Sequence, residues 1–362
     1  MCSRLIVLAT AVCVSPLTAQ QGPAPHRTGT QAPLFAAHER VVLTIRAPLA
    51  TILEDRSQDS EEVPGTVLIH RPGAQAVPVP VQIRTRGRTR LQRGICQFPP
   101  LRLDFAEAAA AGSVFEGQDK LKLVTHCQDR SESVQHVLLE YLVYRTYELF
   151  TDLSFRVRLA TITYQDTATD DEPVTRTAFF IEDDDRMAAR NGWDRLELPA
   201  LPLPAVDTAN LALVETFQYF IGNTDFSALV PDSGETECCH NVQLIGKPRG
   251  PVFAVPYDFD LSGVVNPRYA NRLYRRNLAR FGIRSLRDRV YRGWCGSRPY
   301  VPAVLERFRE KRAAIARLYR SQTGLDQDVL EETIAFFDEF YAVIDDAGST
   351  QREILGKCRQ VG

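Results

Sequence analysis

Hydrophobic and polar positions alternate with a period of two along much of the first half of the chain. Residues 77–84 show this alternation, which is typical of strands that bury one face, and residues 41–45 have the apolar, β-branched composition of a strand. Pro78 and Pro80 mark the second stretch as an edge strand, because proline donates no hydrogen bond to a neighbouring strand. The pattern predicts an N-terminal region made mainly of antiparallel sheet.

The period changes to that of a helix between residues 131 and 150, where Ser131 or Ser133 can cap the first turn. Glu140 stands inside an apolar run of this helix. A buried carboxylate is costly unless a cation pairs with it, so we expect Lys122 or Arg102 as its partner. The alternative is that Glu140 lies on the exposed rim of the helix.

A further helix, expected over residues 207–221, leads into a stretch that is rich in candidate chemistry. Asp225 follows this helix, and Asn241 opens a strand-like segment. Asp258 and Asp260 follow another strand, and side chains two apart on an extended chain point the same way. Two adjacent carboxylates repel each other unless a cation holds them, and Mg²⁺ or Mn²⁺ is the natural candidate.

An Asp, then an Asn, then a metal-holding Asp is the order of parts in kinase-type phosphoryl transfer. Asp225 would orient or deprotonate the acceptor hydroxyl, Asn241 and Asp258 would hold the metal, and Asp260 would be a second ligand or a support. The alternative is that each Asp is a turn or cap residue. Kinase loops place the Asn about five residues after the Asp. Here the interval is sixteen residues and contains Pro231 and Gly234. Either an insertion bulges outward and keeps the geometry, or the site has drifted.

These segments resemble the spore-coat kinase family (CotH-like), a family of atypical kinases. The resemblance runs from about residue 80 to 265 and is strongest at its end. It implies an α+β, protein-kinase-like two-lobed fold, with an N-terminal antiparallel β-rich lobe and a helical C-terminal lobe. It also implies ATP with Mg²⁺ or Mn²⁺ and a protein or other hydroxyl-bearing acceptor. The segments that carry it are Gly222-Asn223-Thr224-Asp225, His240-Asn241, Pro256-Tyr257-Asp258-Phe259-Asp260, Lys120-Leu121-Lys122-Leu123 and Phe180-Ile181-Glu182-Asp183-Asp184-Asp185-Arg186.

The same resemblance implies residues for nucleotide binding. The family commonly carries Lys where Arg102 stands, and Arg is not equivalent to Lys at such a site. Lys120 and Lys122 on the next strand are therefore rival candidates for the phosphate-binding cation. Glu182 ends the strand that corresponds to the hinge, where an adenine would sit. The basic stretch 84–93 is either a cover for phosphates or a solvated turn.

The 362 residues carry a formal net charge of −2 and suffice for one large domain or two modest ones. Residues 1–19 have the positive start, short apolar core and small-residue end of a signal peptide. No later apolar run reaches the length of a membrane span. We therefore expect a secreted or periplasmic protein that does not span a membrane. The expected parts are a signal peptide (1–19), a flexible linker (20–34), a β-rich N-terminal lobe with one long helix (35–182), and a mainly helical C-terminal lobe with the catalytic segment and a helical extension (183–362).

Six cysteines remain after the expected signal peptide, and an even number in an exported chain predicts disulfides. Cys238 and Cys239 are adjacent, and we expect them to pair with two different partners because a bond between neighbours has unfavourable geometry. A zinc site is the competing interpretation, but no Cys-x-x-Cys spacing supports it.

Charge is unevenly distributed in the last third of the chain. Residues 268–320 contain sixteen Lys or Arg and three acids, whereas residues 321–346 contain eight acids and no Lys or Arg. Both segments have helical patterns. Either these helices lie against one another, or the basic face meets an anionic envelope component. We expect no nucleic-acid partner for an exported protein.

Three functions follow from these observations. The first is an exported, ATP-dependent and metal-requiring kinase. The second is a binding or structural envelope protein without transfer activity, which the uncertain phosphate-binding cation and an ATP-poor location favour. The third is a metal-dependent hydrolase that would use Asp225, His240, Asp258 and Asp260.

Overall fold

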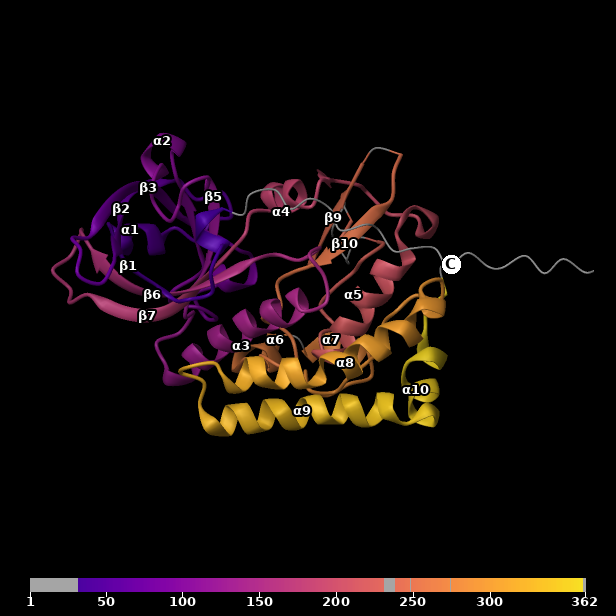
Figure 1. Ribbon diagram of the computed structural model, residues 1–362. Helices are drawn as coiled ribbons and strands as arrows, with labels where there is room; N and C mark the ends of the chain where they lie inside the picture. Colours follow the sequence, from indigo (N-terminus) through magenta and orange to yellow (C-terminus); the bar gives the residue numbers. More distant parts are fainter. Residues whose placement is uncertain (1–31, 231–237, 248, 274, 361–362) are drawn as a thin grey trace, which may run out of the picture.

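The computed structural model describes residues 32–230, 238–247, 249–273 and 275–360. The expected signal peptide, most of the expected linker, Pro231 and Gly234 lie outside these ranges. The described chain forms a β-barrel that packs against a larger part made of helices and a small sheet (Figure 1).

Seven strands close into the barrel in the order β1-β2-β3-β4-β5-β7-β6. Neighbouring strands are antiparallel except β1 and β6, which run parallel and close the barrel. Inward-pointing residues such as Leu43, Ile45 and Ile83 fill the interior, as alternation along each strand requires. The strands are β1 (Val41–Ala47), β2 (Val63–His70), β3 (Val77–Thr85), β4 (Leu101–Asp104), β5 (Lys120–Val124), β6 (Val157–Asp166) and β7 (Val174–Ile181), with short helices α1 (Leu49–Glu54) and α2 (Glu107–Ala110) in the connections.

The predicted two-lobed, protein-kinase-like fold is wrong. The strands form a closed, mixed barrel instead of an antiparallel lobe, and the helical part contains a second sheet with the order β10-β9-β8. The alternation identified strands, but it carried no information on the parallel pairing of Val41 with Ala160, which closes the barrel. Such a pairing depends on how distant segments pack.

The prediction that β3 is an edge strand is also wrong, because β3 pairs with β2 and with β4. The prolines remain compatible with this position. Pro78 and Pro80 face β2, whereas β4 pairs only with residues 82–85. The proline half of β3 therefore has a neighbour on one side, where a missing N–H group is tolerated.

The predicted long helix is confirmed as α3 (Ser131–Glu148). It is buried on nearly all sides, between barrel strands β6 and β7 and helix α8, as expected of a helix that is apolar all round. The remaining elements are α4 (Asp184–Arg190), β8 (Asp194–Leu196), α5 (Thr208–Phe220), β9 (Val242–Gly246), β10 (Val252–Pro256), α6 (Arg268–Leu273), α7 (Arg275–Arg280), α8 (Val301–Arg320), α9 (Gln327–Asp345) and α10 (Ala347–Glu353).

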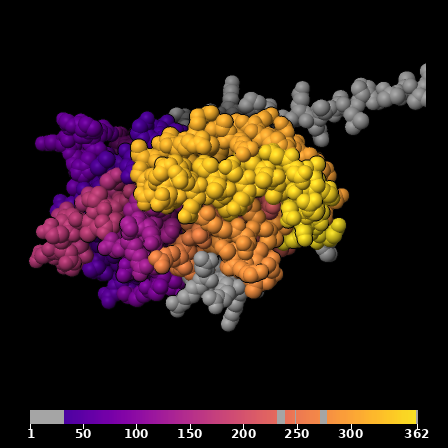
Figure 2. All heavy atoms as spheres, turned by 90° about the horizontal axis from the view of Figure 1, so that it is seen from below, coloured from indigo at the N-terminus to yellow at the C-terminus, as the bar shows by residue number. Residues whose placement is uncertain are grey.

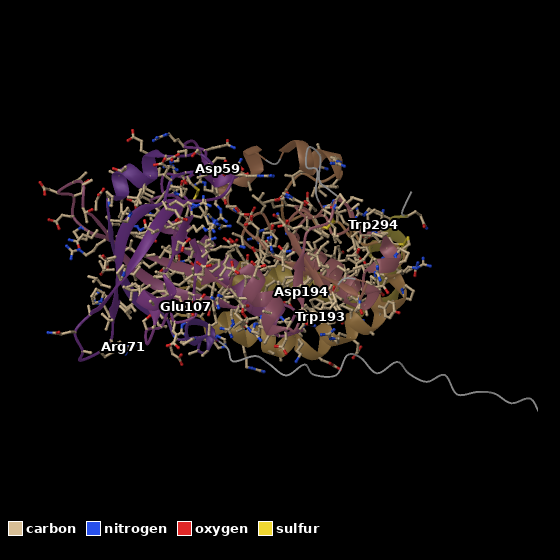
Figure 3. All side chains as sticks on the ribbon, turned by 90° about the horizontal axis from the view of Figure 1, so that it is seen from above. Asp59, Arg71, Glu107, Trp193, Asp194 and Trp294 are labelled. Atoms are coloured by element: carbon tan, nitrogen blue, oxygen red, sulfur yellow. A yellow bond between two sulfur atoms is a disulfide. The ribbon has the colours of Figure 1, made fainter. Side chains whose placement is uncertain are left out.

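Aromatic side chains pack against each other on the small sheet. Trp193, next to Asp194 at the start of β8, lies with its ring centroid 5.1 Å from that of Phe253 on β10 (Figure 3). Val255 and Ala254 of β10 are fully buried, and α5 packs on the same strand. This packing fixes the ends of β9 and β10, where the candidate site residues follow.

The basic and acidic helices lie against one another, which confirms the first of the two expectations from charge. Arg309 of α8 contacts Asp345 at 3.3 Å, and Arg312 contacts Asp338 at 2.9 Å. Helices α8 and α9 form a layer on the lower face of the helical part, and the barrel lies beside this layer (Figure 2). None of the helices in the described ranges has the length and apolar character that crossing a membrane requires.

Candidate functional site

Three segments that carry the candidate acids and the amide meet at one end of the small sheet. Asn241 immediately precedes β9 and Asp258 follows β10, and these strands form an antiparallel pair. The Tyr257 N–H group donates to the Asn241 carbonyl at 3.0 Å. The segment after α5 joins them, since the Ser227 N–H group donates to the His240 carbonyl at 2.9 Å. The fold thus brings Asp225, Asn241 and Asp258 to one place.

Asp225 is buried and is oriented by its neighbours. The side-chain amide of Asn241 donates to the Asp225 carbonyl at 2.7 Å and to its carboxylate at 3.1 Å. Since the nitrogen of Asn241 is used in this way, its amide oxygen is the atom left for a ligand. Nε2 of His240 lies 3.3 Å from Oδ1 of Asp225.

Two of these residues have a left-handed backbone. The φ angle is 52° at Asn241 and 57° at Asp258. Asn and Asp tolerate this region better than most residues, and such conformations cluster at ligand sites. The conformation turns the chain sharply at the ends of β9 and β10, so that both side chains face the same pocket.

A basic loop forms the opposite wall of this pocket. The loop, residues 86–90, runs from the end of β3 into a short 3₁₀ turn over Thr89–Leu91. The pocket has a volume of about 360 Å³, within the range of ligand sites. Its lining residues are Arg86, Gly87, Arg88, Thr89, Arg90, Pro100, Asp225, Cys239, His240, Asn241, Tyr257, Asp258, Asp260 and Leu261.

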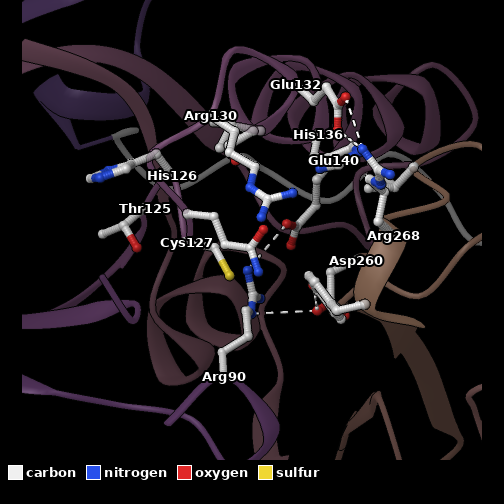
Figure 4. A pocket seen from close by; sticks show the side chains of 15 residues that line it. Arg90, Thr125, His126, Cys127, Arg130, Glu132, His136, Glu140, Asp260 and Arg268 are labelled. Carbon is white, nitrogen blue, oxygen red and sulfur yellow. Dashed lines mark hydrogen bonds and ion pairs between the residues drawn. The ribbon is translucent and has the colours of Figure 1, made fainter. Parts of the chain in front are cut away.

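Arg90 is the residue that joins the two walls. Its guanidinium lies 3.5 Å from Glu140, 3.3 Å from Asp258 and 3.4 Å from Asp260. Arg90, Glu140 and Asp260 are all buried, whereas the side chain of Asp258 is 43% exposed. Figure 4 shows Arg90 between Glu140 and Asp260, on the side of a smaller cavity of about 30 Å³. Arg90 and Asp260 line both cavities, so they form a shared wall.

This wall concentrates acidic groups around Arg90. Burial raises the pKa of Glu140 to about 8 and the pKa of Asp260 to about 6; Arg90 opposes this and the neighbouring carboxylates reinforce it. The hydroxyl of Tyr269 donates to Asp260 at 2.9 Å. The guanidinium of Arg90 contacts all three acidic groups, and Arg86 also lies near Asp258. A further cation at the more exposed Asp258 would reduce its repulsion with Asp260.

The predicted partners of Glu140 are wrong. Lys122 instead contacts Asp184 at 2.7 Å, and its ammonium lies 5.6 Å from the ring centroids of Phe155 and Tyr257. Burial lowers the pKa of Lys122, and Asp184 opposes this shift. Arg102 pairs in register with Lys122 but does not line the pocket. The sequence pattern showed that Glu140 belongs to the helix. It did not show that Arg90 would be its cationic partner, because this contact depends on the path of the loop after β3.

Two other predicted nucleotide-binding residues lie away from the pocket. Lys120 is exposed at the start of β5 and is absent from the pocket lining. Glu182 is buried, and both of its carboxylate oxygens accept hydrogen bonds from Arg190 at 2.9 Å. It also accepts the Arg156 N–H group at 3.1 Å. Glu182 thus has a structural role in this geometry.

The pocket residues could hold a metal ion only if a bound ligand supplied further oxygen atoms to it. Within the described ranges, no group of three or more His, Cys, Asp or Glu residues is arranged to hold an ion. Mg²⁺, however, is usually bound by one or two carboxylates together with substrate phosphates and water. The exposed Asp258 and the amide oxygen of Asn241 match that pattern. Asp260 is committed to Arg90 and Tyr269, so it fits a supporting role.

The predicted disulfides are present, but one pairing prediction is wrong. The bonds join Cys96 to Cys127, Cys295 to Cys358, and the neighbours Cys238 and Cys239 to each other. The other four cysteines pair among themselves, which leaves the adjacent two as partners. Cys239 lines the pocket, and the Cys96–Cys127 bond holds the chain just after the basic loop.

Comparison with known proteins adds no further assignment. No protein-family model matches the chain, and no characterised protein is significantly similar to it in sequence. Sequence reasoning missed the role of Arg90, although the run of arginines around it was a visible signal. It included Asp184 in the segment 180–186 but did not predict its contact with Lys122, and it missed Tyr269.

Proposed function

We propose that this protein is an exported, metal-dependent phosphotransferase that transfers the terminal phosphoryl group of ATP to a hydroxyl group on a protein or another acceptor. The observation that carries the proposal is one pocket with Asp225, Asn241 and Asp258 on one wall and three arginines of the basic loop on the other. The resemblance to the spore-coat kinase family belongs to this proposal. So does export, with which the three disulfides are compatible.

The two walls suit opposite ends of a metal-bound triphosphate. Guanidinium groups bind phosphate oxygens in a planar, bidentate manner, and Arg86, Arg88 and Arg90 line one wall. Carboxylate and amide oxygens on the other wall suit a divalent cation. Phosphoryl transfer needs little covalent chemistry from a protein, so positioning and neutralisation of charge supply most of the catalysis.

Each residue has a distinct role in the proposal. Asp225, held by Asn241 and beside His240, would orient the acceptor hydroxyl and accept its proton. Asn241 and Asp258 would hold the metal, which neutralises phosphate charge when bound. Arg90 would hold Asp260 and Glu140 in place and keep Asp258 directed into the pocket.

A second function, a phosphate-binding or structural protein without transfer activity, is favoured by one observation. Arg90 already contacts Asp258 at 3.3 Å, so the proposed metal residue has a cationic partner without any metal. Such a protein would use the arginine wall to bind anions and would not need Asp225.

Binding of ATP with Mg²⁺ or Mn²⁺ to the purified protein separates these functions. We expect metal-dependent ATP binding that is lost in Asp258→Ala, because this change removes the most exposed carboxylate of the site. Asp194→Ala is the matched control, since Asp194 is an exposed acid on β8 away from the pocket. We expect any transferase activity to fall by several orders of magnitude in Asp225→Asn.

Other outcomes would contradict the proposal. A folded wild-type protein that binds no nucleotide with either metal would favour the second function. Release of phosphate from a simple ester without nucleotide would favour a hydrolase that uses Asp225 and His240.

A further inference from the structure

A hydroxyl group faces the candidate site from the basic loop. Thr89 lines the pocket together with Asp225 and Asp258. It is half-buried, and its hydroxyl has no hydrogen-bond partner in the part of the chain that the structure describes. The other hydroxyl of the pocket belongs to Tyr257, whose ring packs near Phe155 and Lys122.

The position of Thr89 is fixed by its neighbour in the chain. Arg90 is held at 3.3 Å from Asp258, and consecutive Cα atoms are about 3.8 Å apart. The 3₁₀ turn also fixes the loop, since the Gln92 N–H group donates to the Thr89 carbonyl at 3.1 Å. Thr89 therefore lines the same pocket as the proposed metal residue Asp258 and the proposed base Asp225.

We propose that Thr89 is a phosphate acceptor of this protein's own active site, an inference that rests on the phosphotransferase function proposed above. Oγ1 of Thr89 forms a bond to the γ-phosphorus of ATP while the bond from that phosphorus to the β–γ bridging oxygen breaks. ADP leaves with the electron pair of the broken bond, and the proton of the Thr89 hydroxyl passes to Asp225.

The modification limits the activity of the same site. Phosphothreonine carries about −1.5 to −2 charges at neutral pH and three strong acceptor oxygens. It stands in the loop that presents Arg86 and Arg88, and it binds these guanidinium groups in place of the phosphates of ATP. The modified protein consequently binds ATP more weakly than the unmodified protein.

The test is incubation of the purified full chain with ATP and Mg²⁺, followed by intact-mass measurement and localisation of the added phosphoryl group by tandem mass spectrometry. Wild type and Thr89→Ser are expected to gain one phosphoryl group at position 89, because both keep a hydroxyl. Thr89→Val, which has nearly the same shape without the hydroxyl, gains none at this position. A rate that is independent of protein concentration shows that the transfer occurs within one molecule.

The outcomes separate this inference from the proposed function. Consumption of ATP by the wild type with an unmodified Thr89 overturns the inference and leaves the phosphotransferase proposal standing. A wild type that neither binds nor consumes ATP overturns both. A phosphoryl group on Thr89 that persists in Asp225→Asn at the wild-type rate overturns the assignment of Asp225 as the proton acceptor.

Discussion

At the scale of single residues, buried charged side chains determine the structure of the candidate pocket. Arg90 is nine-tenths buried and touches three carboxylates, which come from α3 and from the segment after β10. A buried ion pair adds little net stability, but removal of one partner leaves uncompensated charge and costs much more. Arg90 is therefore needed to keep the wall of the pocket folded, whatever ligand the pocket binds.

Arg90→Met tests this role. We expect the free energy of unfolding to fall by about 3–5 kcal/mol, because the buried carboxylate of Asp260 would lose its cation. Urea denaturation measures the change. Arg88→Met is the matched control two positions earlier in the loop, where the side chain is exposed, and a change within about 0.5 kcal/mol is expected there. Equal stability of the Arg90→Met variant and the wild type would contradict the ion-pair argument.

The buried carboxyl group of Glu215 should make the free energy of unfolding depend on pH. It is buried in α5 and accepts hydrogen bonds from the Trp294 N–H group and the Ser297 hydroxyl. Burial raises its pKa from 4.5 to about 8 despite these hydrogen bonds. The folded state thus binds more protons than the unfolded state between these values, so this group makes stability fall as pH rises through that window.

Glu215→Gln removes this titration and keeps an oxygen that accepts from the Trp294 N–H group. Its amide NH₂ group can donate to the Ser297 oxygen, whose own proton can go to the Trp294 carbonyl. We expect the stability of this variant, relative to wild type, to increase between pH 5 and pH 9 by an amount on the order of a few kcal/mol. Chemical denaturation at several pH values gives the difference. Glu310→Gln, at an exposed position of α8, is the control and should show no such trend. Parallel pH profiles for wild type and Glu215→Gln would contradict the prediction.

At the scale of elements, the loop after β3 is held in place by a covalent bond. Cys96 and Cys127 are linked, and the side chain of Gln128 donates to the Ile95 carbonyl at 2.7 Å. The chain between β3 and β4 is thereby fixed to the start of α3, which carries Glu140. The position of Arg90 depends on both of these elements.

The double variant Cys96→Ser, Cys127→Ser separates this role from general stability. We expect a loss of about 3–4 kcal/mol in the free energy of unfolding, from the greater freedom of the unfolded chain. We also expect weaker ATP binding, because the arginine wall is no longer fixed. The matched control is Cys295→Ser, Cys358→Ser, whose bond lies near the end of the chain and away from the pocket. The control should lose stability alone; an equal loss of ATP binding in both variants would contradict the specific role of the first bond.

At the scale of the whole molecule, the site segment is packed tightly against the C-terminal part. Gly263 follows the Asp258–Asp260 segment, and a Cβ atom there would lie 2.5 Å from the Leu286 carbonyl oxygen and 2.9 Å from the ring of Phe336 on α9. The N–H group of Gly263 donates to the Gly222 carbonyl at 3.1 Å. Helix α9 therefore packs directly against the site segment. The acidic segment 321–346 and the site consequently belong to one folded unit.

Gly263→Ala tests this contact. Since a backbone carbonyl blocks the space, we expect destabilisation of about 1–3 kcal/mol, measured by thermal or chemical unfolding. Gly94→Ala is the control, because nothing lies within 4 Å of the added Cβ and no left-handed backbone is required there. An unchanged stability of Gly263→Ala would show that the segment and α9 are less closely packed than described.

The sequence by itself determined the local elements and which residues carry candidate chemistry. The period of two predicted strands, and the period of 3.6 predicted α3. The opposite charges of residues 268–320 and 321–346 gave the packing of α8 on α9 as one of two alternatives. The sequence also singled out Asp225, Asn241 and Asp258. Asn241 and Asp258 lie in one pocket because β9 and β10 pair as neighbours in the chain, and the bond from Ser227 to His240 adds Asp225. These features depend on short-range patterns, which a single sequence records.

Only the tertiary structure decided the closure of the barrel, the cation that serves Glu140 and the pairing of Cys238 with Cys239. The parallel pairing of β1 with β6 and the contact of Arg90 with three carboxylates join segments far apart in the chain. Several basic residues had the right charge to neutralise Glu140, so composition was unable to choose among them. The choice came from the path of the loop after β3, because the energy of a charge contact depends on distance and burial, which exist only in the folded chain.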